Sequence, residues 1–153
     1  MEIILTIGIQ ATGKSTFVRS RFLDTHVIVS LDVVRTRRRE EAVVRACLGA
    51  GQRVVVDNTN VSRDERRRYF EWAEDTKFKV NGYYFQSRID DALARNRTRS
   101  GRKCVPDKGV LAAARRLEVP SVDEGFSELH YVSLHGDDFR VSAWDPEALG
   151  HAL

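Results

Sequence analysis

Apolar residues along the chain fall into short continuous runs, separated by longer stretches in which they recur with helical spacing. The first run, "EIILTIGI" at residues 2–9, is continuously apolar and rich in β-branched residues. Such a run is typical of a strand that is covered on both faces. Four further runs predict strands, at 25–30, 53–57, 78–85 and 128–134. A sixth segment, at 138–144, is compatible with a short edge strand.

The stretches between these runs carry the signals of helices. The third predicted helix has a capping-box signature, a serine followed three residues later by a glutamate. The five helices are expected to start after Lys14, to span about 33–48, and to begin at Ser62, near Ile89 and at Pro106. Alternating strands and helices predict an α/β fold, with a central parallel sheet of about five strands flanked by helices. Ligands of such sheets bind beyond the carboxyl ends of the strands.

Length and composition fit one domain spanning residues 1–153 of a chain of 17.4 kDa, 42% of it hydrophobic. No run approaches the roughly 18 apolar residues of a transmembrane helix, so no membrane partner is expected. The N-terminus lacks the basic leader of a signal peptide. Cys47 and Cys104 form neither a disulfide framework nor a metal-binding spacing. These features favour a cytoplasmic protein.

The segment "GIQATGKS" fits the phosphate-loop pattern G-x-x-x-x-G-K-[ST] and lies where that motif requires, between a strand and a helix. Glycines allow the loop to turn its amides toward phosphates, and the helix N-terminus adds partial positive charge. Lys14 is expected to reach the β- and γ-phosphates of ATP, and the Ser15 hydroxyl to bind Mg²⁺. The predicted nucleotide-binding residues are Gly8, Ala11, Thr12, Gly13, Lys14, Ser15 and Thr16.

Two aspartates follow predicted strands and should emerge at the same sheet edge as this loop. Asp57, in "RVVVDNTN", is expected near the metal on the substrate side, although a turn-capping role is also compatible with its position. Asp32, in "VIVSLD", is placed to accept the proton of an acceptor hydroxyl, as a kinase requires. Arg35, three residues later, would bind a neighbouring phosphate if a helix starts there. A helix N-cap is an equally good explanation of Asp32.

Basic residues are concentrated in three clusters, at 35–40, 63–68 and 95–103. Clustered arginines are typical of a surface that binds a polyanion, and equally of solvated helix faces. The third cluster lies where compact phosphotransferases carry a lid, so we expect an arginine-rich lid at about 95–105. A lid arginine would stabilise the transferring phosphoryl group.

Taken together, "GIQATGKSTF", "SLDVVR", "VVVDNTN", "ARNRTR", "CVPDKGV" and "PSVDEGF" resemble the kinase domain of the polynucleotide 5′-kinase family, which heals nucleic-acid ends. The resemblance runs from about residue 2 to 134 and implies the P-loop kinase fold. It implies that Asp32 is the general base for the 5′-hydroxyl and that Arg35 binds the adjacent phosphate. It assigns Lys14 and Ser15 to ATP and Mg²⁺, and Arg99 as the catalytic lid arginine.

The leading functional hypothesis is ATP-dependent phosphorylation of the 5′-hydroxyl end of DNA or RNA. Better-known members of the family carry a phosphatase or another healing domain on the same chain, so a separate phosphatase or ligase is an expected partner. A kinase of a small-molecule hydroxyl on the same fold is the main alternative. A nucleotide-dependent binding or switch module is a third, and fold alone does not separate them.

Overall fold

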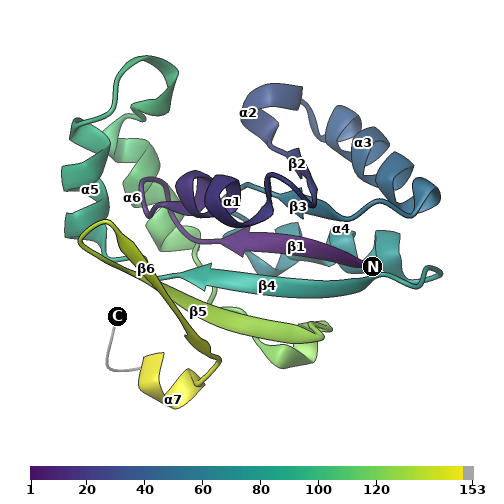
Figure 1. Cartoon of the computed structure of the whole chain (residues 1–153). Helices are drawn as coiled ribbons and strands as arrows, with labels where there is room; N and C mark the ends of the chain where they lie inside the picture. Colours follow the sequence, from purple (N-terminus) through teal and green to yellow (C-terminus); the bar gives the residue numbers. More distant parts are fainter. Residues whose placement is uncertain (150–153) are drawn as a thin grey trace.

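The computed structural model describes residues 1–149, which form a six-stranded sheet in the order β2-β3-β1-β4-β5-β6 (Figure 1). Strands β1 to β5 are parallel, and β6 runs antiparallel to β5 at one edge. The predicted α/β architecture is therefore confirmed, with the edge strand raising the number to six. Residues 150–153 of the expected domain lie outside the described residues.

In chain order the elements are β1 (Glu2–Ile7), α1 (Lys14–Phe22), β2 (Val27–Val29), α2 (Leu31–Val34), α3 (Arg37–Ala50), β3 (Val54–Val56), α4 (Arg63–Ala73), β4 (Lys79–Phe85), α5 (Ile89–Arg97), η1 (Gly101–Lys103), α6 (Asp107–Arg116), η2 (Val122–Glu124), β5 (Glu128–His135), β6 (Asp138–Ala143) and α7 (Pro146–Leu149).

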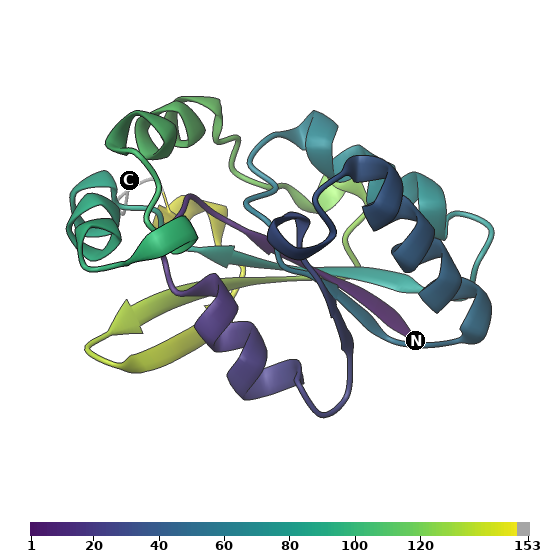
Figure 2. The same cartoon turned by 90° about the horizontal axis from the view of Figure 1, so that it is seen from above.

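Helices cover both faces of the sheet, as continuously apolar strands require (Figure 2). Leu5 of β1 points to the face on which α3 and α4 pack and shares a buried cluster with Tyr69. Its neighbour Ile4 points to the opposite face and packs with Phe17 of α1. Helices α5 and α6 form a separate apolar cluster that includes Ile9, at the carboxyl end of β1. This arrangement leaves the end of β1 surrounded by elements from distant parts of the sequence.

The second predicted helix, expected as one unit over 33–48, is divided into α2 and α3. Arg35 adopts a left-handed backbone conformation (φ 74°), which a continuous helix does not allow. Each half has its own N-cap: the Ser30 hydroxyl accepts a hydrogen bond from the amide of residue 32 (3.2 Å), and the Thr36 hydroxyl accepts one from the amide of residue 39 (3.2 Å). Two caps six residues apart explain the break.

The remaining boundaries agree closely with expectation. Strands β2 and β3 are shorter than their apolar runs, with three residues each. Helix α4 is capped by Ser62, whose hydroxyl accepts from the Glu65 amide, while the Glu65 carboxylate accepts from the amide of Val61 rather than that of Ser62. Within residues 1–149, every helix is too short or too polar to span a bilayer.

A buried ion pair fixes α4 to the turn before β5. Arg66 has no exposed surface and donates to the Glu124 carboxylate through Nε (2.8 Å) and Nη2 (3.0 Å). Its Nη1 donates to the carbonyls of Asn60 and Val61, at the start of the helix. The guanidinium therefore joins three segments through four hydrogen bonds, and its paired geometry compensates for the loss of hydration.

Replacing Arg66 by alanine should strongly destabilise the fold, because the Glu124 carboxylate would remain buried without its partner. Removing one member of a buried pair typically costs about 3–5 kcal/mol. Urea denaturation should show this loss. Arg67→Ala, which removes an exposed pair with Asp64 one position along the same helix, provides the control and should leave the midpoint nearly unchanged. Equal midpoints for the two variants would contradict the assigned role of Arg66.

Candidate functional site

The phosphate loop occupies residues 8–13, between β1 and α1. Gly13 is the N-cap of α1 with φ 92°, a conformation that favours glycine. A Cβ atom at this position would lie 2.8 Å from Cε1 of Phe139, so glycine is needed for space as well as for conformation. Because Phe139 belongs to β6, the edge hairpin packs directly against the loop.

Hydrogen bonds from three distant segments hold the loop in shape. The Gly8 amide donates to the carbonyl of Thr59 (2.9 Å), and the Ile9 amide donates to the Ser87 hydroxyl (3.2 Å). On the outer side, Arg95 of α5 donates to the carbonyl of Ala11 (3.4 Å), a residue with positive φ (59°). The loop is therefore supported by the segments that follow β3 and β4 and by helix α5.

Lys14 lies at the centre of the predicted site and is 8% exposed. Its Nζ donates to the Ile9 carbonyl (2.5 Å) and to Thr12 Oγ1 (3.5 Å), so the side chain folds back over its own loop. Burial lowers the pKa of Lys14 from 10.5 to about 8, Asp57 and Asp32 favour the ammonium, and Arg99 opposes it. The fold thus brings three of the predicted site residues, from three separate elements, within electrostatic range of the lysine.

Ser15 and Asp57 are in direct contact. The Ser15 hydroxyl donates to Oδ2 of Asp57 (2.7 Å), across 42 residues of sequence. These are hard oxygen donors of the kind that Mg²⁺ prefers, and Mg²⁺ commonly uses one or two protein carboxylates together with substrate phosphates. Among residues 1–149, no group of three or more histidine, cysteine or acidic side chains could hold a metal on its own. The donor set therefore fits a magnesium ion that is completed by a nucleotide.

Asp32 lies in the first turn of α2, and its side chain is exposed. The N-cap explanation of this residue is excluded, because Ser30 caps the helix. No hydrogen bond ties the carboxylate to another part of residues 1–149, so it is free to meet a ligand. Arg35 is also exposed and follows the last residue of α2 as its C-cap. Because α2 ends at Val34 and Arg35 has a positive φ, the expected helical alignment of Arg35 with Asp32 is not formed.

The predicted lid at 95–105 connects α5 to α6 and contains the last turn of α5 and the short helix η1. Asn96 at the end of α5 exchanges two hydrogen bonds with the backbone of Val105, which closes the base of the segment. Arg97 pairs with Asp107 across that base (3.3 Å). Arg99 donates to the carbonyl of Lys103 (3.2 Å) and is the lid cation that acts on the pKa of Lys14.

The three basic clusters differ in how far their charge is compensated. In the 63–68 cluster, three arginines pair with carboxylates: Arg63 with Asp123, Arg66 with Glu124 and Arg67 with Asp64. In the 35–40 cluster only Arg37 is paired, with Glu40. Within residues 1–149, no ion pair joins a carboxylate to Arg35, Arg38, Arg39, Arg99 or Arg102. Of the three clusters, the one that follows Asp32 and the one in the lid therefore keep more uncompensated positive charge than the cluster at 63–68.

Two asparagines in "DNTN" have roles that the sequence did not specify. Asn60 (φ 44°) donates from Nδ2 to the carbonyl of Thr6 (2.8 Å) and so ties the segment after β3 to β1. Asn58 joins the end of β3 to the start of α2, since its Oδ1 accepts from the amide of Leu31 (2.9 Å). Only the clustering of polar residues after an apolar strand hinted at such contacts.

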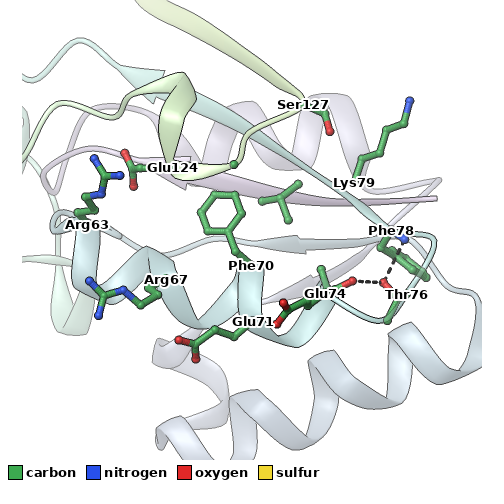
Figure 3. A pocket seen from close by; sticks show the side chains of 13 residues that line it. Arg63, Arg67, Phe70, Glu71, Glu74, Thr76, Phe78, Lys79, Glu124 and Ser127 are labelled. Atoms are coloured by element: carbon green, nitrogen blue, oxygen red, sulfur yellow. Dashed lines mark hydrogen bonds between the residues drawn. The ribbon is translucent and has the colours of Figure 1, made fainter.

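A groove of about 590 Å³ lies away from this site, between α4 and the segments that precede β4 and β5 (Figure 3). Phe70 forms its centre, with Arg63 and Arg67 toward one end and Lys79 toward the other. Lys79 is the register partner of Glu2 at the start of β1, whereas the phosphate loop follows the end of that strand. The groove is therefore at the opposite edge of the sheet from Lys14 and takes no part in the site.

A parallel sheet whose central strand leads through this loop into a helix defines a P-loop nucleotide-binding protein. The chain belongs to the AAA domain family AAA_33, which matches residues 3–120. It is 25% identical over 135 residues to the bifunctional polynucleotide phosphatase/kinase of Schizosaccharomyces pombe, covering 86% of this chain and 33% of that protein. The chain thus spans about a third of the length of this curated relative.

Solved structures share the fold. A chain of the Pnkp1/Rnl/Hen1 RNA repair complex superposes with a TM-score of 0.65 and 21% identity, covering 76% of this chain and 43% of that one. A gluconokinase from Sinorhizobium meliloti 1021 superposes with a TM-score of 0.60 and 16% identity, covering 86% and 82%. The family match and the phosphate loop class the chain as a P-loop nucleotide-binding protein, and the solved structures show that it shares their fold.

The lowered pKa of Lys14 predicts a pH-dependent nucleotide affinity. Because the ammonium form binds phosphate, ATP affinity should fall as the pH rises above about 8, and binding near pH 8.5 should take up a proton. Calorimetric titrations in buffers of different ionisation enthalpy would detect this uptake. Lys14→Met should bind weakly and show no such uptake. An affinity that is constant from pH 7 to 9.5 in the wild type would contradict the prediction.

The lowered pKa of Lys14 also makes the free energy of unfolding depend on pH. Between about pH 8 and 10.5 the unfolded chain keeps the proton on Lys14 and the folded protein releases it. Since the unfolded state binds more protons in this window, the contribution of Lys14 to the free energy of unfolding rises with pH there. This contribution is lost as the pH falls from about 10.5 through about 8. Comparison with Lys14→Met isolates this contribution.

Proposed function

We propose that this protein transfers the γ-phosphate of ATP to the 5′-hydroxyl end of a nucleic acid. The observation that carries the proposal is the exposed Asp32 carboxylate on α2, which makes no hydrogen bond within residues 1–149 and lies within electrostatic range of Lys14. A phosphotransferase needs a carboxylate beside the γ-phosphate to accept the proton of an acceptor hydroxyl. The sequence similarity to a polynucleotide phosphatase/kinase supports a nucleic-acid end as that acceptor.

The residues of the site supply each part of such a transfer. Asp32 accepts the proton as the hydroxyl oxygen attacks the γ-phosphorus, and the bond between that phosphorus and the β–γ bridging oxygen breaks to release ADP. Lys14 and Arg99 stabilise the negative charge on the phosphoryl oxygens. Arg35 binds the phosphate next to the attacking hydroxyl.

Magnesium has a natural place in this scheme. With its proton directed at Asp57, the Ser15 hydroxyl keeps a lone pair for a metal ion. Mg²⁺ bound there would neutralise charge on the β- and γ-phosphates. The expected nucleotide-binding residues Ala11 to Thr16 would contact the nucleotide through backbone amides and short hydroxyl side chains, and Gly8 would allow the turn of the loop.

The distribution of uncompensated charge supports a polyanionic acceptor. Arg35, Arg38 and Arg39 follow Asp32 directly and have no carboxylate partner within the described residues. We infer that the phosphates beyond the first lie along this segment. The ion-paired cluster at 63–68 is not part of the binding surface in this proposal. Separate phosphatase or ligase activities would complete the healing of an end.

The first experiment measures transfer of labelled γ-phosphate from ATP, with Mg²⁺, to a short 5′-hydroxyl oligonucleotide. Wild-type protein should label the 5′ end, and Asp32→Asn should reduce the rate by about 10²–10⁴-fold, the usual contribution of a general base. ATP affinity should be retained in the variant, because Asp32 is outside the phosphate loop.

Two other outcomes would redirect the assignment. Labelling of a sugar or nucleoside, with no labelling of DNA or RNA, would identify a small-molecule kinase instead. ATP turnover that needs a protein partner and tolerates Asp32→Asn would indicate a switch module.

The acceptor surface is tested by a charge-matched pair of variants. Arg38→Ala with Arg39→Ala should raise the KM for an oligonucleotide about tenfold and leave the KM for ATP unchanged. The slope of the logarithm of the binding constant against the logarithm of the salt concentration should also become shallower. For a single strand it should change by roughly 0.7 for every phosphate that the variant no longer binds. Arg63→Ala with Arg67→Ala removes the same charge from the ion-paired cluster and should change neither quantity. Similar effects of the two pairs would refute the assigned path.

A further inference from the structure

A buried carboxylate lies close to the start of α2, in the core between α3, α4 and the end of β3. Glu40 of α3 has no exposed surface. Its carboxylate accepts hydrogen bonds from Nη1 of Arg37 (3.1 and 3.2 Å), from the hydroxyl of Tyr69 (3.0 Å) and from Nδ2 of Asn58 (2.7 Å). These partners come from α3, α4 and the end of β3, so the cluster is fully satisfied by three elements.

Asn58 links this cluster to the element that carries Asp32. Because its amide nitrogen faces the acidic Glu40, its amide oxygen must face the other way, where it accepts from the Leu31 amide at 2.9 Å. That amide is one of the N-terminal donors of α2 that helical bonding leaves unsatisfied. Asn58 directly follows Asp57, and Leu31 directly precedes Asp32. Through Asn58, the segment that carries Asp57 is therefore hydrogen-bonded to the segment that carries Asp32.

Helix α2 has few other contacts that hold it in place. It contains four residues, none of them fully buried: Val34 packs partly against the core cluster, whereas Val33 is 79% exposed. It ends at Arg35 in a left-handed conformation. A helix of this length with no buried side chain gains little from packing, so hydrogen bonds at its first turn dominate its position.

We propose that Asn58 is a positioning residue, which holds Asp32 against the ATP and metal side of the site and is itself oriented by Glu40. This inference rests on the proposed role of Asp32 in phosphoryl transfer. Asn58 contacts no reacting atom. Its effect is to fix the distance between two strand ends, and a displacement of about 1 Å can cost about 100-fold in rate.

The polarity of the Asn58–Glu40 contact allows a reciprocal test. Asn58→Asp places two carboxylates face to face, whereas in Glu40→Gln the amide oxygen can still accept from Asn58 Nδ2. In the double variant the amide nitrogen introduced at position 40 donates to the carboxylate introduced at position 58, which still accepts from the Leu31 amide. Asn58→Asp should lower kcat by about 10- to 100-fold, Glu40→Gln should stay within about threefold of wild type, and the double variant should recover most of the activity lost in Asn58→Asp.

A merely structural role would give a different result. The affinity for ATP, which is bound by the phosphate loop, should stay within about twofold in all three variants. Tyr69→Phe serves as the matched control, because it removes one hydrogen bond from Glu40 but leaves the bridge from Asn58 to Leu31 intact. It should lower the denaturation midpoint and preserve kcat.

Amide hydrogen exchange separates this inference from the proposed function. Residues 31–34 should lose protection in Asn58→Asp, keep it in Glu40→Gln and regain it in the double variant, whichever hydroxyl the protein phosphorylates. If the wild-type protein phosphorylates no nucleic-acid end but its variants show this exchange pattern, the proposed acceptor is rejected and the bridge from Asn58 to Leu31 is retained. Unchanged protection and kcat in Asn58→Asp, or a double variant no better than Asn58→Asp, would overturn the inference.

Discussion

The buried ammonium of Lys14 is the charge around which the carboxyl edge of the sheet is organised. A lysine that is 8% exposed is costly to keep charged, and its pKa of about 8 expresses that cost. Asp57 from the end of β3 and Asp32 from α2 offset part of it. A triphosphate would offset far more, because it brings several negative charges to the same place. The site is thus arranged to be most favourable when an anion is bound.

The structure separates the parts that are fixed by packing from those fixed by hydrogen bonds. Strand β1 and the phosphate loop are surrounded by buried apolar side chains and by backbone contacts to Thr59 and Ser87. Helix α2 and the lid instead depend on a few polar contacts, from Asn58 and Asn96 respectively. Such regions open more easily than a packed core. In the proposed function, the two elements that would meet an incoming acceptor are therefore the ones whose positions are least constrained by the core.

Charge is distributed unevenly in a way that composition conceals. From the sequence alone, the three basic clusters look alike in their positive charge. In the fold, the arginines of the 63–68 cluster serve structure, most clearly Arg66 in its buried pair. Those that follow Asp32 are left without acidic partners among the described residues, apart from Arg37. The same residue type therefore stabilises one edge of the molecule and remains available for ligands at another.

The sequence by itself determined the class of fold and the composition of the phosphate site. Continuous apolar runs predicted the parallel sheet, and the spacing of Gly8, Gly13 and Lys14 predicted the loop, because both signals are local. The break at Arg35 was missed, although the caps Ser30 and Thr36 are visible, because an arginine gives no local signal of a positive φ. Ion pairs such as Arg66 with Glu124, and the bridge from Asn58 to Leu31, join residues 58 and 27 positions apart. Only the tertiary structure decided these, since a side chain's partners depend on which strand ends the fold brings together.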